Sequence, residues 1–147
     1  SNIIRKHKVE DTASVNLFFK SGTLCTLNVS DTIVSPWSYE LTAGENPAYP
    51  ITDQSSYFIG GTKGSLQFPN LKLWYYKKER SWWNNIYNNK IKVQKGNKTL
   101  INQIDHFSKV VMKKEKPKVT GKDGLNSLII FDAINKSSKS GKKIRIN

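Results

Sequence analysis

Histidine and cysteine, which often perform catalysis or bind metals, together number three in this 147-residue chain. The two histidines, His7 and His106, lie far apart in the sequence, and only Asp105 accompanies either of them at ligand spacing. Adjacent residues of a helix point about 100° apart, so Asp105 and His106 are poor joint ligands. Cys25 is the single cysteine, which excludes an internal disulfide and a cysteine-based zinc site. The sequence therefore predicts no metal site.

The glycine-rich segment at residues 60–64 has a composition similar to that of a phosphate-binding loop. A phosphate loop leads into a helix, whose N-terminus receives the anion. Here a pattern typical of a strand follows instead, because Leu66 and Phe68 alternate with polar residues. We interpret the segment as a hairpin turn.

The net charge of +13 comes almost entirely from lysine, since Arg5, Arg80 and Arg145 are the only arginines. Lysine and arginine neutralise phosphates, so a basic chain invites comparison with nucleic-acid-binding proteins. The lysines are scattered, however, and arginine is the residue that makes bidentate contacts with phosphates and bases. We expect solvated lysines and no specific nucleic-acid binding. A basic β domain that stacks bases on Trp and Tyr is kept as a third hypothesis.

The first two thirds of the chain have the alternation of apolar and polar residues that is typical of strands. Val15 and Leu17, for example, alternate with Ser14 and Asn16 before a turn at residues 21–22. We predict strands at residues 13–20, 23–30, 38–42, 55–60, 65–68, 71–77 and 90–94. A Trp- and Asn-rich loop is expected at residues 81–89.

The last third changes to a helical period. Leu100, Ile104, Phe107 and Val111 form one apolar stripe of a helix. A second helix is expected to begin near Asp123 as N-cap and to end before Gly141. Its inward residues would be Leu125, Leu128, Phe131 and Ile134, and a last strand is expected at residues 143–146.

Strands followed by helices predict an α+β fold, with an open, mostly antiparallel sheet and helices packed on one face. The length fits a single domain, residues 1–147. No apolar run approaches the roughly 20 residues of a membrane helix, and no signal-peptide pattern opens the chain. With one cysteine and no membrane segment, the expected location is the cytoplasm.

Several segments, taken in order, resemble one family. Residues 10–32 resemble the hairpin that follows the catalytic helix in Gfo/Idh/MocA oxidoreductases. The remaining similar segments are two loop patterns, a strand connection and the starts of two helices, at residues 35–40, 44–50, 61–66, 103–107 and 121–125. Their order and spacing cover nearly the whole chain, so the chain resembles the C-terminal domain of such an enzyme.

The resemblance implies a parent protein that transfers hydride between NAD or NADP and a hydroxyl carbon of a sugar, polyol or related compound. In the family, the glycine-rich dinucleotide fingerprint and the catalytic lysine belong to an N-terminal Rossmann half. The helix with the acid/base histidine precedes the hairpin. None of these has a counterpart in this sequence, so we expect no catalytic and no cofactor-binding residues, and no activity of this chain alone.

The resemblance implies that this chain forms one wall of the substrate pocket. Gln103 and His106 share a helix face, and in the family the start of this helix approaches the substrate. Ser35, Trp37 and Asn46 lie in loops that could reach the same cleft. For His106 a place at the edge of the core is equally consistent with the sequence, and for Trp37 packing is the main alternative.

The resemblance also implies a homo-oligomer, because the exposed sheet face in the family usually pairs with another subunit. We expect Trp74 and Tyr76 to lie on an uncovered face, opposite Leu71, Leu73 and Tyr75. The alternative function is a stand-alone interaction module that dimerises without catalysis. A dinucleotide fingerprint in the reading frame upstream of residue 1 would favour the oxidoreductase, and a start codon there would favour the module.

Overall fold

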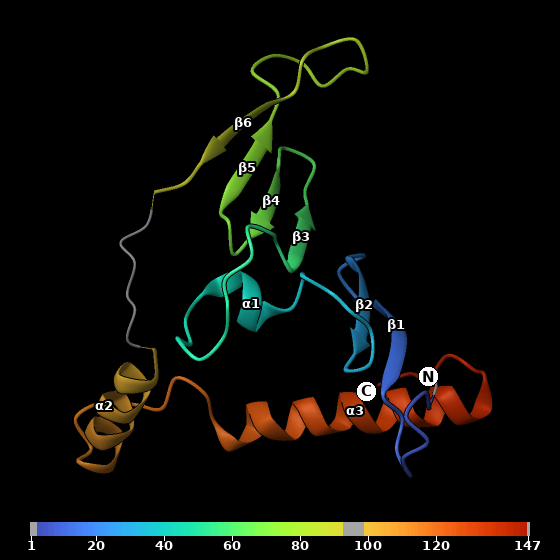
Figure 1. Ribbon diagram of the computed structural model, residues 1–147, viewed down its shortest axis with the longest axis vertical. Helices are drawn as coiled ribbons and strands as arrows, with labels where there is room; N and C mark the ends of the chain where they lie inside the picture. The colour runs from blue at the N-terminus through green and yellow to red at the C-terminus, as the bar shows by residue number, and fades with distance from the viewer. Residues whose placement is uncertain (1–2, 93–98, 147) are drawn as a thin grey trace. The chain divides into compact units, whose positions relative to one another are not determined.

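The computed structural model describes residues 3–92 and 99–146, which form two compact units. One unit comprises Ser1–Val34 and Phe107–Asn147, and the other comprises Ser35–His106. Figure 1 shows their helices and strands by label. Each unit is described by itself below.

The first unit begins with an antiparallel hairpin of β1 (Thr12–Phe18) and β2 (Leu24–Ser30). Opposite residues share a face, so Val15 pairs with Leu27 and Leu17 with Cys25 on the apolar side. Gly22 turns the chain with a φ of 87°, which glycine adopts without steric cost. The predicted hairpin and its two faces are confirmed, and each strand is shorter than predicted.

Helix α3 (Gly121–Ser140) has its end signals within its own sequence. Thr120 is the N-cap, and its hydroxyl accepts a hydrogen bond from the Asp123 amide while the Asp123 carboxylate accepts one from the Thr120 amide. The Thr120 hydroxyl also donates to the Asp123 carboxylate, and this bond lowers the pKa of Asp123 most, followed by the bond from the Thr120 amide. The prediction that Asp123 is the N-cap is therefore wrong by three residues. Gly141 ends the helix at a φ of 67°, as predicted.

The apolar positions of α3 are less buried than the sequence predicts. Leu125, Leu128 and Phe131 are exposed, whereas Ala133 is buried and Ile134 is half-buried. The first three turns therefore carry exposed apolar side chains. Residues 143–146 form no strand, which corrects the predicted last strand. Within this segment, the Lys143 ammonium lies 4.4 Å from the centre of the Phe18 ring.

The second unit contains a four-stranded antiparallel sheet in the order β3-β4-β5-β6 (Figure 1). Its strands are β3 (Tyr57–Gly60), β4 (Ser65–Phe68), β5 (Lys72–Tyr75) and β6 (Tyr87–Lys90). Strand β6 lies earlier than the predicted strand at 90–94, of which residues 93–94 lie outside the described residues. Tyr87 pairs with Tyr75, so the Trp- and Asn-rich loop ends before Tyr87.

The strand register gives the sheet one apolar and one mixed face. The face that we name the apolar sheet face carries Tyr57, Ile59, Leu66, Phe68, Leu73, Tyr75 and Tyr87, with Asn89 as its polar member. Trp74 lies on the opposite face, where the Lys72 ammonium is 4.5 Å from its ring centre. Lys90 pairs with Lys72 on that face, and Tyr76 lies beyond the end of β5. Trp74 therefore lies opposite Leu73 and Tyr75 as predicted, and Tyr76 lies outside the strand.

Helix α2 (Thr99–Val111) has the predicted amphipathic stripe. Leu100, Ile104, Phe107 and Val111 follow one line along the helix, and all four are exposed. The chain leaves the helical path at Lys113, which has a φ of 58°. Glu115 then pairs with Lys109, with 3.6 Å between nitrogen and oxygen.

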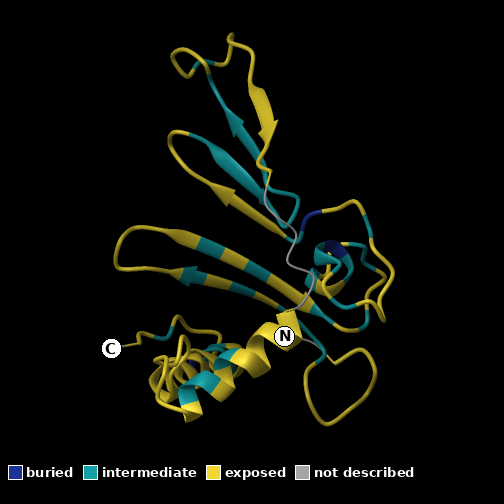
Figure 2. Cartoon of the chain, turned by 90° about the vertical axis from the view of Figure 1, so that its left-hand side faces the viewer, coloured by how far each residue is buried: buried dark blue, intermediate teal, exposed yellow. Residues whose placement is uncertain are grey.

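Burial is low throughout the part of the chain that the structure describes. Only Ala133, Thr42 and Ser55 are buried there. In Figure 2, β4 and β5 are half-buried, and β3 and β6 at the edges are exposed. The α+β class with open antiparallel sheets is confirmed, with the strands divided over two sheets. No helix within residues 3–92 and 99–146 has the length and apolarity to cross a membrane.

Candidate functional site

The loops predicted to approach a substrate surround the short helix α1 (Tyr39–Ala43), where the sequence predicts a strand. Ser38 is its N-cap, and the Ser38 hydroxyl accepts a hydrogen bond from the Leu41 amide at 3.3 Å. Gly44 ends the helix with a φ of 64°. Five residues are too few to show a helical period, so the two caps decide the structure here.

Hydroxyl groups hold the chain around α1. The buried Thr42 hydroxyl donates to the Ser38 carbonyl at 2.9 Å and lies 3.2 Å from the Ser56 hydroxyl. The Thr52 hydroxyl donates to the Pro36 carbonyl at 2.7 Å, while the Thr52 amide donates to the Leu41 carbonyl at 2.9 Å. Segments before and after α1 are therefore tied to the helix, which fixes the loop that carries Trp37.

The structure brings two of the predicted substrate residues together. The Ser35 hydroxyl accepts a hydrogen bond from the Trp37 amide at 3.2 Å, which forms a turn and leaves the Trp37 side chain 54% exposed. An indole that is half exposed is available for stacking, and the substrate role of Trp37 stays a prediction. Asn46 lies after α1, where its side-chain oxygen accepts from the Ala48 amide at 3.0 Å. Asn46 therefore shapes its own loop.

Gln103 and His106 both lie on α2, one turn apart, with Gln103 exposed and His106 half-buried. They share a helix face as predicted, because residues three apart are neighbours on a helix surface. The sequence boundary between the two units falls within α2, after His106. The approach of Gln103 and His106 to the loops around Trp37 stays a prediction.

An aromatic cluster beside α1 was not predicted from the sequence. The Tyr39 ring stacks on Phe68 with 6.1 Å between ring centres, and Tyr57 lies edge-on to Tyr39 at the same distance. Together with Ile59, these rings line a cavity of about 390 Å³. The cavity is apolar and lies on the apolar sheet face. No local sequence signal predicts the cluster, because its rings come from three different elements.

Tyr39 also supplies a hydrogen-bond donor to this cluster. Its hydroxyl donates to the Glu45 carboxylate at 3.1 Å. Burial raises the pKa of Tyr39, and the hydrogen bond and negative charge of Glu45 raise it further. The phenol therefore keeps its proton at neutral pH and acts as a hydrogen-bond donor.

The described residues do not fit a dinucleotide. A dinucleotide site needs a parallel βαβ unit whose glycine-rich turn leads into a helix N-terminus. Every strand pair here is antiparallel, and the Gly60–Gly64 turn joins β3 to β4. Histidine, cysteine and carboxylate side chains likewise form no group of three that could hold a metal ion within residues 3–92 and 99–146.

The comparison with protein families gives the decisive observation. The family described as the oxidoreductase family, C-terminal alpha/beta domain, matches residues 2–146. This chain belongs to the Gfo/Idh/MocA oxidoreductase family, as its C-terminal domain. Comparisons with curated proteins and with solved structures gave no match. The described part of this Gfo/Idh/MocA domain combines antiparallel sheets with helices, and it contains no dinucleotide-binding fold.

Proposed function

We propose that this chain is the substrate-side and oligomerisation domain of an NAD(P)-dependent oxidoreductase that acts on a sugar, polyol or related hydroxy compound. The family match over residues 2–146 carries the proposal. The parent's nucleotide-binding half would bind the cofactor and supply the catalytic residues. The single Cys25 and the lack of disulfides favour the cytoplasm as its location.

The proposed substrate wall combines the Trp37 loop with the first turns of α2. Trp37 offers an exposed ring, and the amide of Gln103 and the imidazole of His106 offer hydrogen bonds to hydroxyl groups. Ser35 positions the Trp37 backbone, and Asn46 shapes the neighbouring loop. These residues would bind and orient the substrate.

The chain alone should not bind a nicotinamide cofactor specifically. Titration of the purified chain with NADH and with NADPH, followed by nicotinamide fluorescence, should show no saturable binding at micromolar concentrations. The reason is the antiparallel connection at the glycine cluster. Weak attraction of NADPH to a chain of charge +13 should disappear with salt. Saturable micromolar binding that persists at high salt would contradict the prediction.

The substrate role of α2 can be tested in the full-length protein that contains this domain. His106→Ala and Gln103→Ala should each raise the KM for the sugar or polyol about tenfold, through loss of hydrogen bonds to the substrate. The affinity for NAD(P) should stay unchanged.

Asn102→Ala is the matched control, because Asn102 is a polar, exposed neighbour that points about 100° away from Gln103. Equal KM values for all three variants and the unmutated protein would remove α2 from the substrate site. Loss of cofactor affinity instead would indicate a role at the domain boundary.

We also propose that two copies of the chain pair through the apolar sheet face. Family members usually pair through a sheet, and here the register leaves Tyr57 and Ile59 exposed on one side of edge strand β3. Exposed apolar faces larger than a few hundred Å² generally mark interfaces. A symmetric dimer buries the same patch of both copies.

A further inference from the structure

The β5–β6 loop (residues 76–86) contains a defined turn. The Ser81 carbonyl accepts a hydrogen bond from the Asn84 amide at 3.2 Å, which closes a β-turn. Trp82 and Trp83 are the two central residues of this turn. The Ser81 hydroxyl also accepts a hydrogen bond from the Trp83 amide at 3.2 Å, and the Asn84 side chain donates to a backbone carbonyl of the loop at 2.8 Å. These bonds hold the backbone that carries the two tryptophans.

The two tryptophans are almost fully exposed. Trp82 is 98% exposed and Trp83 is 94% exposed. The central positions of β-turns are usually occupied by small or polar residues such as Gly, Asn and Asp, and not by large apolar ones. Rings that stay in water contribute nothing to folding through burial, and adjacent exposed apolar side chains mark a contact surface more often than single ones do. The two rings are therefore available to a partner.

The β5–β6 loop also projects from its sheet. Figures 1 and 2 show the loop extending beyond the end of the four-stranded sheet, past the turn that joins β3 to β4. Residues 77–80 and 82–86 of the loop are all exposed. A broad, flat partner can therefore reach the loop before it meets the rest of this sheet.

Basic side chains precede the turn. Lys77, Lys78 and Arg80 are all exposed, and Glu79 is the only carboxylate in the sequence of the loop. The Lys77 ammonium lies 4.2 Å from the centre of the Tyr87 ring, which holds it in place. In the part of the chain that the structure describes, none of the three basic side chains pairs with a carboxylate. The loop therefore presents positive charge to an anionic partner.

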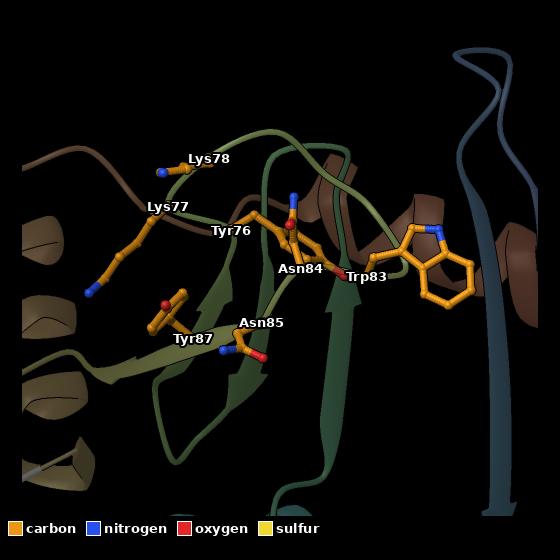
Figure 3. A pocket seen from close by; sticks show the side chains of 7 residues that line it. All are labelled: Tyr76, Lys77, Lys78, Trp83, Asn84, Asn85 and Tyr87. Atoms are coloured by element: carbon orange, nitrogen blue, oxygen red, sulfur yellow. The ribbon is translucent and has the colours of Figure 1, made fainter.

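The ring of Trp83 and the two lysines lie on different sides of the loop. Figure 3 shows the Trp83 ring pointing away from Lys77 and Lys78, with Tyr76 and Asn84 between them. One small ligand cannot contact the ring and both lysines from such an arrangement. The headgroup layer of a membrane surrounds an inserted loop on all sides, so rings and ammonium groups that point in different directions each meet lipid.

We propose that the β5–β6 loop binds the surface of a membrane that contains anionic lipids. Trp82 and Trp83 enter the boundary between headgroups and acyl chains, where the amphipathic indole ring is favoured. The basic side chains that precede them contact the anionic headgroups. Binding is weak and reversible, since its strength increases with the buried apolar area and with the electrostatic attraction. The loop shares no residue with the proposed substrate wall or with the apolar sheet face, so each proposal can fail without the others.

Co-sedimentation of the chain with lipid vesicles tests the proposal. Vesicles of phosphatidylcholine with about one third phosphatidylserine should bind the chain at roughly millimolar lipid. Vesicles of phosphatidylcholine alone should bind it about tenfold more weakly, and added salt should weaken binding to the anionic vesicles. Phosphatidylcholine with brominated acyl chains, mixed into the anionic vesicles, should quench the tryptophan fluorescence of the bound chain, because the bromine atoms lie beside the inserted rings.

Substitutions in the loop should weaken binding to the anionic vesicles. Trp82→Ala and Trp83→Ala should each weaken it about tenfold, through loss of apolar area that the membrane buries, and should reduce the quenching. Lys78→Gln should weaken it about fivefold, through loss of attraction to the headgroups. All three side chains are exposed, so the substitutions leave the packing of the sheet unchanged.

Two matched variants separate the loop from general charge and hydrophobicity. Phe58→Ala removes an exposed aromatic ring from β3, and Lys90→Gln removes a lysine from the end of β6 that lies away from the loop. Both should bind the anionic vesicles like the unmutated chain. Equal losses in these variants and in the loop variants would overturn the proposal, as would unchanged binding by both tryptophan variants. Binding of a single-stranded oligonucleotide that is tighter than vesicle binding, and is lost in both tryptophan variants, would overturn it in favour of nucleic acid.

Discussion

Ile59→Lys should weaken the proposed dimer of this chain about thirtyfold, whereas Phe58→Lys should leave it nearly unchanged. Ile59 lies on the apolar sheet face beside Leu66, and Phe58 lies opposite Gln67 on the mixed face. Both side chains are exposed, at 58% and 70%, so neither lysine would be buried in the isolated chain. A charge within an apolar interface is costly, and a thirtyfold loss of affinity corresponds to about 2 kcal/mol.

Sedimentation at several micromolar concentrations gives the dissociation constant for each variant. The charge of +13 opposes association, but salt at physiological concentration screens it beyond about 8 Å. A monomer for the unmutated chain at high concentration would remove the dimer proposal. A monomer only for Phe58→Lys would assign the interface to the face that carries Trp74. Loss of the dimer in both variants would indicate pairing along the β3 edge.

Gly64→Ala should destabilise the chain by about 2 kcal/mol, since overpacked sites typically cost this much. A methyl group on Gly64 would lie 2.9 Å from the Trp74 carbonyl oxygen. That oxygen belongs to the backbone of β5, which pairs with β4 next to Gly64. The backbone has no rotamer with which to move aside, so the strands must separate.

Gly60→Ala is the control for that substitution, because a methyl group there meets nothing within 4 Å. Thermal unfolding followed by circular dichroism should give a Tm for Gly64→Ala that is about 5 °C below the Tm of the unmutated chain, given the size of the chain. The Tm of Gly60→Ala should stay within about 2 °C of that of the unmutated chain. Equal shifts would show that the effect comes from loss of glycine in the β3–β4 region rather than from the contact with β5.

The sequence predicts the elements that depend on local periodicity and on a nearby turn or cap residue. The β1–β2 hairpin follows from strict alternation on both sides of Gly22, because one face of the pair is apolar. Helix α3 follows from its period and from Gly141. The five residues of α1 also fit an alternation, so their pattern predicts a strand, and the Ser38 cap is the local signal for a helix. In a segment too short to show a period, the capping residues indicate whether a helix forms.

Long-range pairing explains most of the remaining differences between the predicted and the observed elements. Strand β6 contains Asn88 and Asn89, which are poor strand formers, and its position is set by pairing with β5. The aromatic cluster of the candidate site joins Tyr39, Tyr57 and Phe68, which come from three different elements. No local pattern connects residues so far apart in sequence. Ser35 and Trp37, which are neighbours, could be placed together from the sequence.

The two edges of the four-stranded sheet differ in their side chains. Strand β3 at one edge carries Tyr57, Phe58 and Ile59, and β6 at the other ends in Asn88, Asn89 and Lys90. Charged and polar side chains discourage a further strand from adding to an edge, and apolar ones permit it. Two copies that met edge to edge through β3 would therefore present only β6 edges outward. Such growth stops at a closed pair and does not continue into a fibre.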